Sequence, residues 1–184
     1  MRARPARSRR TFLRSGAAAA LGVIAGQRPL AAQGGTKHRR VVTGTNTSGA
    51  SLVVSDGRTP QIARLENPAV GNTSDDLWVL PHLPASLADA RDPVADYTRQ
   101  PWPVLGGAIV RMFTWAPGFT FPLHKSDTID FVFILSGRVE MQLDVGTVEL
   151  GPGDTLVQRG TNHGWRVLGA EPCTLAAVIV SAAR

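Results

Sequence analysis

Residues 136–154 read SGRVEMQLDVGTVELGPGD, and this stretch decides the fold class. Every second residue from Val139 to Val145 is apolar, and the residues between them are polar. Because successive side chains of a strand point to opposite faces, this alternation is typical of an antiparallel strand with one face on a core. Glycine-containing turns follow at Val145-Gly146 and Gly151-Pro152-Gly153. The stretch therefore predicts short strands joined by tight turns.

The rest of the chain extends this pattern in both directions. We expect Phe131 and Phe133 to lie in the core of the resulting β-sandwich or small barrel. Strand-like runs precede the quoted stretch and flank it at Arg39–Val42, Ser51–Ser55, Gln61–Leu65, Leu77–Leu80, Ala108–Trp115, Ile129–Leu135, Thr155–Gln158, Gly164–Leu168 and Cys173–Val180. Residues 81–103 hold five prolines, so we expect a long irregular segment there, either a lid over a pocket or an arm on a partner subunit.

The positive charge of the chain lies at its beginning. The formal net charge is +6, but seven arginines and no acidic residue lie in residues 1–32. The remainder carries 13 Lys and Arg against 14 Asp and Glu, a formal charge of −1. No basic and aromatic cluster is left to follow a phosphate backbone, so we do not expect a nucleic-acid partner.

Residues 1–32 have the order of a bacterial export signal: an Arg-rich stretch, the apolar run Gly16–Gly26, and small residues at Ala31-Ala32. The run is shorter than the ~20 residues that span a bilayer. Ser8–Arg14 resembles the twin-arginine signal. We therefore expect export in folded form to the periplasm or the extracellular space, with no membrane span after processing. The predicted parts are a signal peptide (1–32), an N-terminal extension with short strands and a Pro-rich loop (33–103), and a barrel (104–184).

Two histidines occur with a distinctive spacing in the barrel. Gly118 is followed after five residues by His124, and Ser126, Asp130 and Gly137 come after it. Downstream, His163 closes the stretch Gly153–His163. This pattern resembles the cupin superfamily, whose first motif is G-x5-H-x-H-x3-4-E-x6-G and whose second is roughly G-x5-P-x-G-x2-H-x3-N, with Gln158 here where the proline is usual. The resemblance covers residues 104–181 and implies a double-stranded β-helix, a jelly-roll barrel with a central pocket.

The resemblance also implies a metal site, and two of its ligand positions depart from the family pattern. The four family ligand positions fall on His124, Ser126, Asp130 and His163, so one histidine is a serine and the glutamate is an aspartate. Two imidazoles and one carboxylate are a donor set for one divalent first-row metal: iron, manganese, nickel, cobalt or zinc. Asp127 is an alternative carboxylate, but on a regular strand it would face away from His124.

Three functions stay open at this point. The first is a metal-dependent enzyme of the oxygenase or lyase/isomerase type, with His124, Asp130 and His163 as ligands and catalytic residues. The second is a metal-free acid/base enzyme that uses a histidine as base and Asp130 as its orienting group. The third is a module that binds a small molecule without catalysis, and either histidine taken alone would more often be structural.

Further residues complete the predicted pocket for a small-molecule substrate. We assign Ser126, Arg159 and Trp165 to this pocket, Trp165 as a flat apolar wall and Arg159 as an anchor for a carboxylate or phosphate. Cys173, the single cysteine, cannot form an intrachain disulfide and is expected in the core. Many cupins dimerise by exchanging N-terminal strands, which residues 33–65 would permit in a homodimer.

Overall fold

The computed structural model describes residues 38–64, 72–87 and 91–183. Within these ranges the chain forms twelve β-strands and no helix. These residues belong to the compact unit Gly35–Arg184. The predicted all-β class is confirmed. The predicted signal peptide lies outside the described residues. Within them, no helix has the length and apolar character needed to cross a membrane.

The strands are short and follow one another closely along the chain. They are β1 (Arg39–Thr45), β2 (Ser51–Arg58), β3 (Gln61–Arg64), β4 (Thr73–Leu80), β5 (Ala108–Trp115), β6 (Thr120–His124), β7 (Thr128–Ser136), β8 (Arg138–Leu143), β9 (Thr147–Leu150), β10 (Thr155–Arg159), β11 (His163–Leu168) and β12 (Cys173–Ser181).

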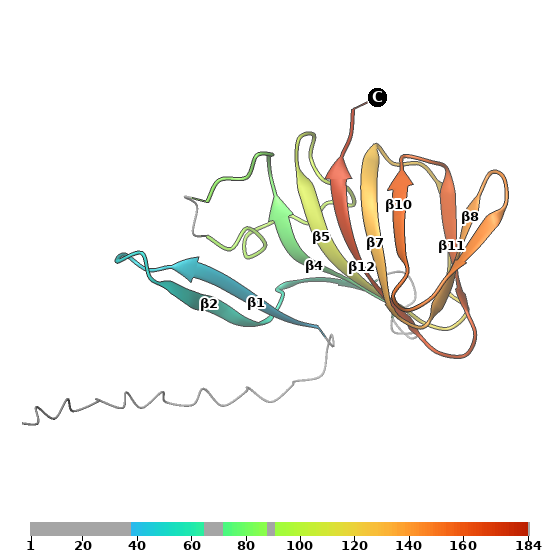
Figure 1. Ribbon diagram of the computed structural model, residues 1–184, viewed down its shortest axis with the longest axis horizontal. Helices are drawn as coiled ribbons and strands as arrows, with labels where there is room; N and C mark the ends of the chain where they lie inside the picture. The colour runs from blue at the N-terminus through green and yellow to red at the C-terminus, as the bar shows by residue number, and fades with distance from the viewer. Residues whose placement is uncertain (1–37, 65–71, 88–90, 184) are drawn as a thin grey trace, which may run out of the picture. The chain divides into compact units, whose positions relative to one another are not determined.

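The strands form two larger sheets and one hairpin, all with antiparallel pairing. The six-stranded sheet has the order β10-β7-β12-β5-β4-β3, most of which can be followed in Figure 1. The four-stranded sheet has the order β6-β11-β8-β9, and β1 pairs with β2 alone. Because the chain passes repeatedly between the two larger sheets from β5 onwards, it winds as the predicted double-stranded β-helix, a jelly-roll barrel.

The hydrophobic core lies between the two larger sheets. Trp115, Val132 and Leu175 contribute to it from the six-stranded sheet, and Met141 and Trp165 from the four-stranded sheet. All five side chains are at most 7% exposed. Burying side chains of this size contributes roughly 1.5–3 kcal/mol each, so this inter-sheet layer is the main source of stability.

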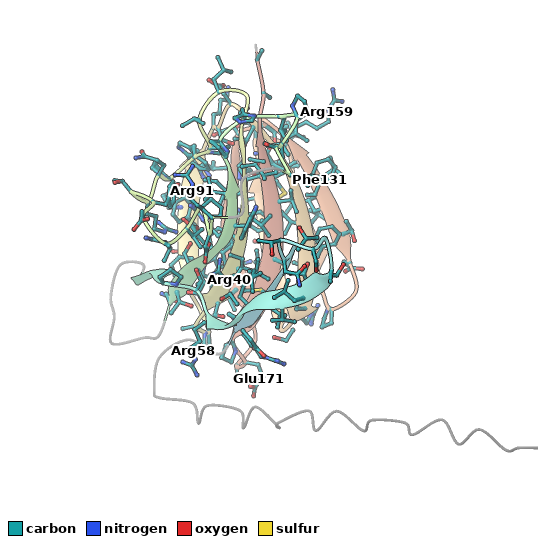
Figure 2. The ribbon with its side chains drawn as sticks, turned by 90° about the vertical axis from the view of Figure 1, so that its left-hand side faces the viewer. Arg40, Arg58, Arg91, Phe131, Arg159 and Glu171 are labelled. Carbon is teal, nitrogen blue, oxygen red and sulfur yellow. The ribbon has the colours of Figure 1, made fainter. Side chains whose placement is uncertain are left out.

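The structure corrects the prediction that Phe131 and Phe133 belong to the core. Both side chains lie on the outer face of β7, 39% and 41% exposed, and Figure 2 shows Phe131 there. The inward face of β7 carries Asp130, Val132 and Ile134 instead. The expectation for Cys173 is confirmed: the thiol is fully buried, and burial raises its pKa to about 11.

The six-stranded sheet extends into the part of the chain that was predicted as an N-terminal extension. β4 pairs with β5 from Thr73↔Thr114 to Leu80↔Ala108, and β3 pairs with β4. The predicted boundary at residues 103/104 therefore falls between two strands that are hydrogen-bonded neighbours. Between β4 and β5, the described residues 91–107 contain no strand, as the prolines predicted.

Candidate functional site

His124 and His163 lie opposite each other across two neighbouring strands. They are register partners at the end of β6 and the start of β11, and their ring centroids are 4.2 Å apart. A bulge follows His163, where a Cβ at Gly164 would come within 2.9 Å of the Phe121 carbonyl oxygen. Only glycine fits this approach of the two strands, so Gly164 brings the two imidazoles together.

Each imidazole is held by the backbone of its own strand or turn. His124 Nδ1 lies 3.0 Å from the Pro122 carbonyl oxygen, and His163 Nδ1 lies 2.9 Å from that of Thr161. These contacts leave Nε2 of each ring as the nitrogen for chemistry. Burial lowers the pKa of His163, His124 lowers it further, and the bond to Thr161 acts in the opposite direction. His163 is therefore held toward its neutral form.

Gln158 is a second partner of His163. Its side chain is fully buried, and its Nε2 lies 3.1 Å from His163 Nδ1 and 3.3 Å from Ser126 Oγ. Its Oε1 accepts a hydrogen bond from the Gly160 backbone N–H, which fixes the orientation of the amide. The amide N–H requires His163 Nδ1 to accept, whereas the Thr161 carbonyl requires it to donate. The two neighbours thus favour opposite tautomers of His163.

Asp130 is a buried carboxyl group with one unused oxygen. It lies on β7 and is 8% exposed, and its Oδ1 has no hydrogen-bond partner among the described residues. Burial raises the pKa of Asp130, while a hydrogen bond with Thr128 and the charge of His124 lower it. A desolvated carboxyl group beside an imidazole can accept or hold a proton.

The site opens into an apolar cavity of about 180 Å³ between the two sheets. Trp102 stacks on His124 with ring centroids 5.8 Å apart and planes inclined by 22°. Trp165 meets His163 edge-on at 5.9 Å. The cavity is lined by Ser74, Arg99, Pro101, Trp102, Arg111, Phe113, Trp115, Phe121, His124, Asp130, Val132, His163, Trp165, Leu175, Ala177 and Ile179. Aromatic and aliphatic walls with a few polar groups are typical of small-molecule sites.

The structure brings together most of the predicted site. His124, Asp130, His163 and Trp165 all line the cavity. Ser126 is buried behind it, where its hydroxyl is 2.7 Å from Thr128 Oγ1, and it does not line the cavity.

Arg159 also lies outside the cavity. Its side chain is exposed at the end of β10, as Figure 2 shows. On β10 the inward position belongs to the buried Gln158, and adjacent residues point to opposite faces. The prediction that Arg159 anchors a ligand in the pocket therefore finds no support in the structure.

The three predicted metal ligands share the cavity but do not form a metal site as placed. Two imidazole Nε2 atoms and the unpartnered Asp130 Oδ1 have the right chemistry for a first-row metal. Across the described ranges, however, no group of three His, Cys, Asp or Glu side chains is arranged to hold a metal ion. The three residues thus have suitable donor atoms for a first-row metal, but these atoms are not arranged to hold one.

Three residues of the site were missed from the sequence. The departure from the cupin pattern at Gln158 was the one visible signal for its role. Arg111 lies within the largely apolar run Ala108–Trp115, and a charged residue in such a run indicates a buried charge. Arg99 lies in the irregular segment, and no local pattern indicates that it reaches the cavity.

Comparison with known proteins identifies the domain. Residues 111–180 match the family described as "Cupin domain". Together with the jelly-roll topology and the paired histidines, this match shows that the chain contains a cupin domain.

Several curated proteins are similar to the chain. The cupin-domain-containing oxidoreductase srdD of Neurospora crassa is 34% identical over 129 residues, 68% of this chain and 64% of that protein. The cupin-domain-containing oxidoreductase fogC of Aspergillus ruber is 30% identical over 131 residues, 68% and 62% of the two chains. The chain therefore spans less than two thirds of the length of these relatives. Among solved structures, the cupin domain of Schizosaccharomyces pombe Cnp3 is 15% identical, with a TM-score of 0.47 over 79% of this chain and 89% of that one.

Proposed function

We propose that the protein is an enzyme that moves a proton on a small organic molecule bound in the cavity. The observation that carries this proposal is the pair of imidazoles at 4.2 Å, both anchored through Nδ1 and both lining an apolar cavity. One neutral imidazole can accept a proton through Nε2, and its neighbour or Asp130 can supply one. The naming of relatives as oxidoreductases supports an enzymatic role over binding alone.

His163 is the base in this proposal. It is the more deeply buried of the two histidines, and burial lowers its pKa and keeps it neutral. Gln158 and Thr161 compete for its Nδ1, so a small shift in either contact changes which ring nitrogen carries the proton. Trp102 stacks on His124 and Trp165 meets His163 edge-on, so aromatic surface lies beside both rings.

A second candidate function is a metal-dependent oxidoreductase. It is favoured by the unpartnered Asp130 Oδ1 and by the names of the relatives. His124, His163 and Asp130 would hold the metal in an arrangement that differs from the one described, and the metal would supply the redox chemistry. No residue other than these three is needed as a ligand in this candidate.

Deuterium uptake from solvent tests the first candidate even when the reaction product is unidentified. The protein is incubated in D2O with a panel of cavity-sized carbonyl compounds, and incorporation at carbon is followed by mass spectrometry. We expect uptake into at least one compound with the wild type and none above background with His163→Gln. Binding of panel compounds without uptake into any of them would contradict the proton-transfer function.

A further inference from the structure

The cavity has a second polar end, made by two arginines. Arg111 projects into it from β5, in register with Asp76 on β4. Arg99 reaches the same cavity from the Pro-rich segment between β4 and β5. Neither residue belongs to the histidine cluster or to the cupin motifs, and the proposed proton transfer uses neither.

The two guanidinium groups share a single carboxylate. Asp76 is fully buried, and its Oδ1 accepts from Arg111 Nε at 2.5 Å while its Oδ2 accepts from Arg111 NH2 at 3.2 Å. Arg99 Nε lies 3.3 Å from Asp76 Oδ2 at an ion-pair distance. Asp75 is the neighbouring residue on β4, so its side chain points to the opposite face of the sheet. Two guanidinium groups thus share the Asp76 carboxylate at this end of the cavity, while Asp75 acts on Arg99 through its charge alone.

The two arginines differ in how fully their donors are used. Arg111 is 4% exposed and also donates to the Gln100 and Pro101 carbonyl oxygens, at 2.8 and 2.9 Å. It therefore holds the Pro-rich segment against the sheet. Arg99 donates from NH2 to Ser74 Oγ at 2.5 Å, but its buried Nε has no hydrogen-bond partner in the described part of the chain. Burial and the charge of Arg111 lower the pKa of Arg99, whereas the charges of Asp76, Tyr97 and Asp75 raise it, and a bound anion would raise it further.

The remaining walls suit a flat apolar body. Trp102, Phe113, Trp115 and Trp165 line the space between the two polar ends. An apolar cavity of about 150 Å³ is known to accept benzene, so about 180 Å³ has room for one ring and a small polar group.

We propose that the cavity binds a small organic carboxylate, with its carboxylate on Arg99 and its apolar body against the aromatic walls. Arg99 presents a guanidinium at the cavity wall, and a guanidinium pairs with a carboxylate through parallel hydrogen bonds. The apolar body then lies beside His124 and His163, so the proposal names the substrate class of the proposed function and rests on the same cavity. It requires binding only, and its test is independent of turnover.

Benzoate and benzamide provide a matched pair of probes, since they have the same shape and differ in charge. Binding is measured by titration calorimetry with full-length wild type, Arg99→Gln and the control Arg166→Gln. Arg166 is an exposed residue that pairs with Glu140 and does not line the cavity. We expect benzoate to bind the wild type and the control about tenfold or more tighter than benzamide, and Arg99→Gln to lose this preference.

Three results would overturn the proposal: equal binding of the two probes to the wild type, no benzoate binding at all, or a preference that survives in Arg99→Gln. Circular dichroism checks that Arg99→Gln is folded. If it is not, Arg99→Lys keeps the charge without the parallel hydrogen bonds. This variant must then bind benzoate more weakly than the wild type does, but still more tightly than it binds benzamide. Benzoate binding together with no deuterium uptake would retain this proposal and reject the proton-transfer function. Deuterium uptake without any preference for benzoate would reject this proposal and retain the proton-transfer function.

Discussion

Gln158 Nε2 lies 3.1 Å from His163 Nδ1, so a buried amide from the six-stranded sheet contacts the imidazole that begins β11 of the other sheet. This contact crosses the core layer and competes with the Thr161 carbonyl for the same nitrogen. Gly160 has a φ of +63°, a conformation that favours glycine, and its N–H orients the Gln158 amide. The tautomer of the proposed base is therefore set by the turn between β10 and β11.

Replacing Gln158 by methionine removes this competition and keeps the apolar volume. We expect His163 to hold its proton on Nδ1, donating to Thr161, and the protein to lose about 1–3 kcal/mol of stability from the broken buried hydrogen bonds. Nitrogen-15 NMR of the imidazoles reports the tautomer. Gln142→Met is the control, because Gln142 is half-buried and bonds Glu140 away from the cavity. An unchanged His163 spectrum in Gln158→Met would show that Gln158 has no influence on the tautomer.

Loss of either imidazole removes one partner of the proton transfer. His124→Gln and His163→Gln are each expected to lower solvent deuterium uptake by about 10²- to 10⁴-fold, the usual contribution of a positioned acid or base. His82→Gln serves as the matched control, because His82 is exposed and bonds the carbonyl of Pro84 in its own turn. A variant at His163 that retained wild-type uptake would exclude this residue as the base.

Gly164→Ala tests the bulge that brings the two histidines together. The added Cβ would lie 2.9 Å from the Phe121 carbonyl oxygen and 3.1 Å from the Leu123 nitrogen, which are backbone atoms of β6. We expect β6 to move away from β11, at a cost of about 1–3 kcal/mol in thermal or denaturant unfolding, together with a loss of uptake. Gly57→Ala, where the new Cβ meets nothing within 4 Å, should change neither quantity. Equal stability of the two variants would contradict the close approach.

The buried Asp75 makes stability depend on pH. Burial raises its pKa to about 6, the charge of Asp76 raises it as well, and Arg99 and Arg58 act in the opposite direction. A folded-state pKa above the unfolded one means that ionisation destabilises the fold. This penalty is present above about pH 6 and disappears as the pH falls toward 4.

Asp75→Asn should therefore stabilise the protein at pH 7, by roughly 2 kcal/mol, and this gain should vanish near pH 4. Urea unfolding of wild type and variant across this range measures the difference. The exposed Asp96 provides the control variant Asp96→Asn, whose stability relative to wild type should not vary in this way. A gain that is the same at every pH would contradict the shifted pKa of Asp75.

Local alternation predicted much of the barrel. The run Ala108–Trp115 coincides with β5, and the run Cys173–Val180 lies within β12. β6 was missed because Pro122 lies within it. Proline lacks the N–H of a central strand, but β6 is at the edge of its sheet, where proline is tolerated. The run from Phe131 to Leu135 is apolar on both faces, so its sequence could not indicate which face meets the core.

The candidate site depended on register, which local patterns do not determine. The cupin motif spacing placed His124 and His163 in one site, and the antiparallel pairing of β6 with β11 makes them direct neighbours. The arginine end of the cavity was not predicted, because it needs β4 beside β5 and the Pro-rich segment folded over both. Ser74, Asp75 and Asp76 precede the predicted run Leu77–Leu80, yet all three lie on β4 and are fully buried.

Deuterium uptake by metal-free protein tests the central claim most directly. The wild type is dialysed against a chelator, its metal content is measured by elemental mass spectrometry, and uptake into the responsive compound of the panel is compared before and after. We predict the same uptake at less than about a tenth of an equivalent of metal, with a loss only in His124→Gln and His163→Gln. Uptake that disappears with the metal and returns when a divalent first-row ion is added would contradict this account and show that the proton transfer depends on a metal.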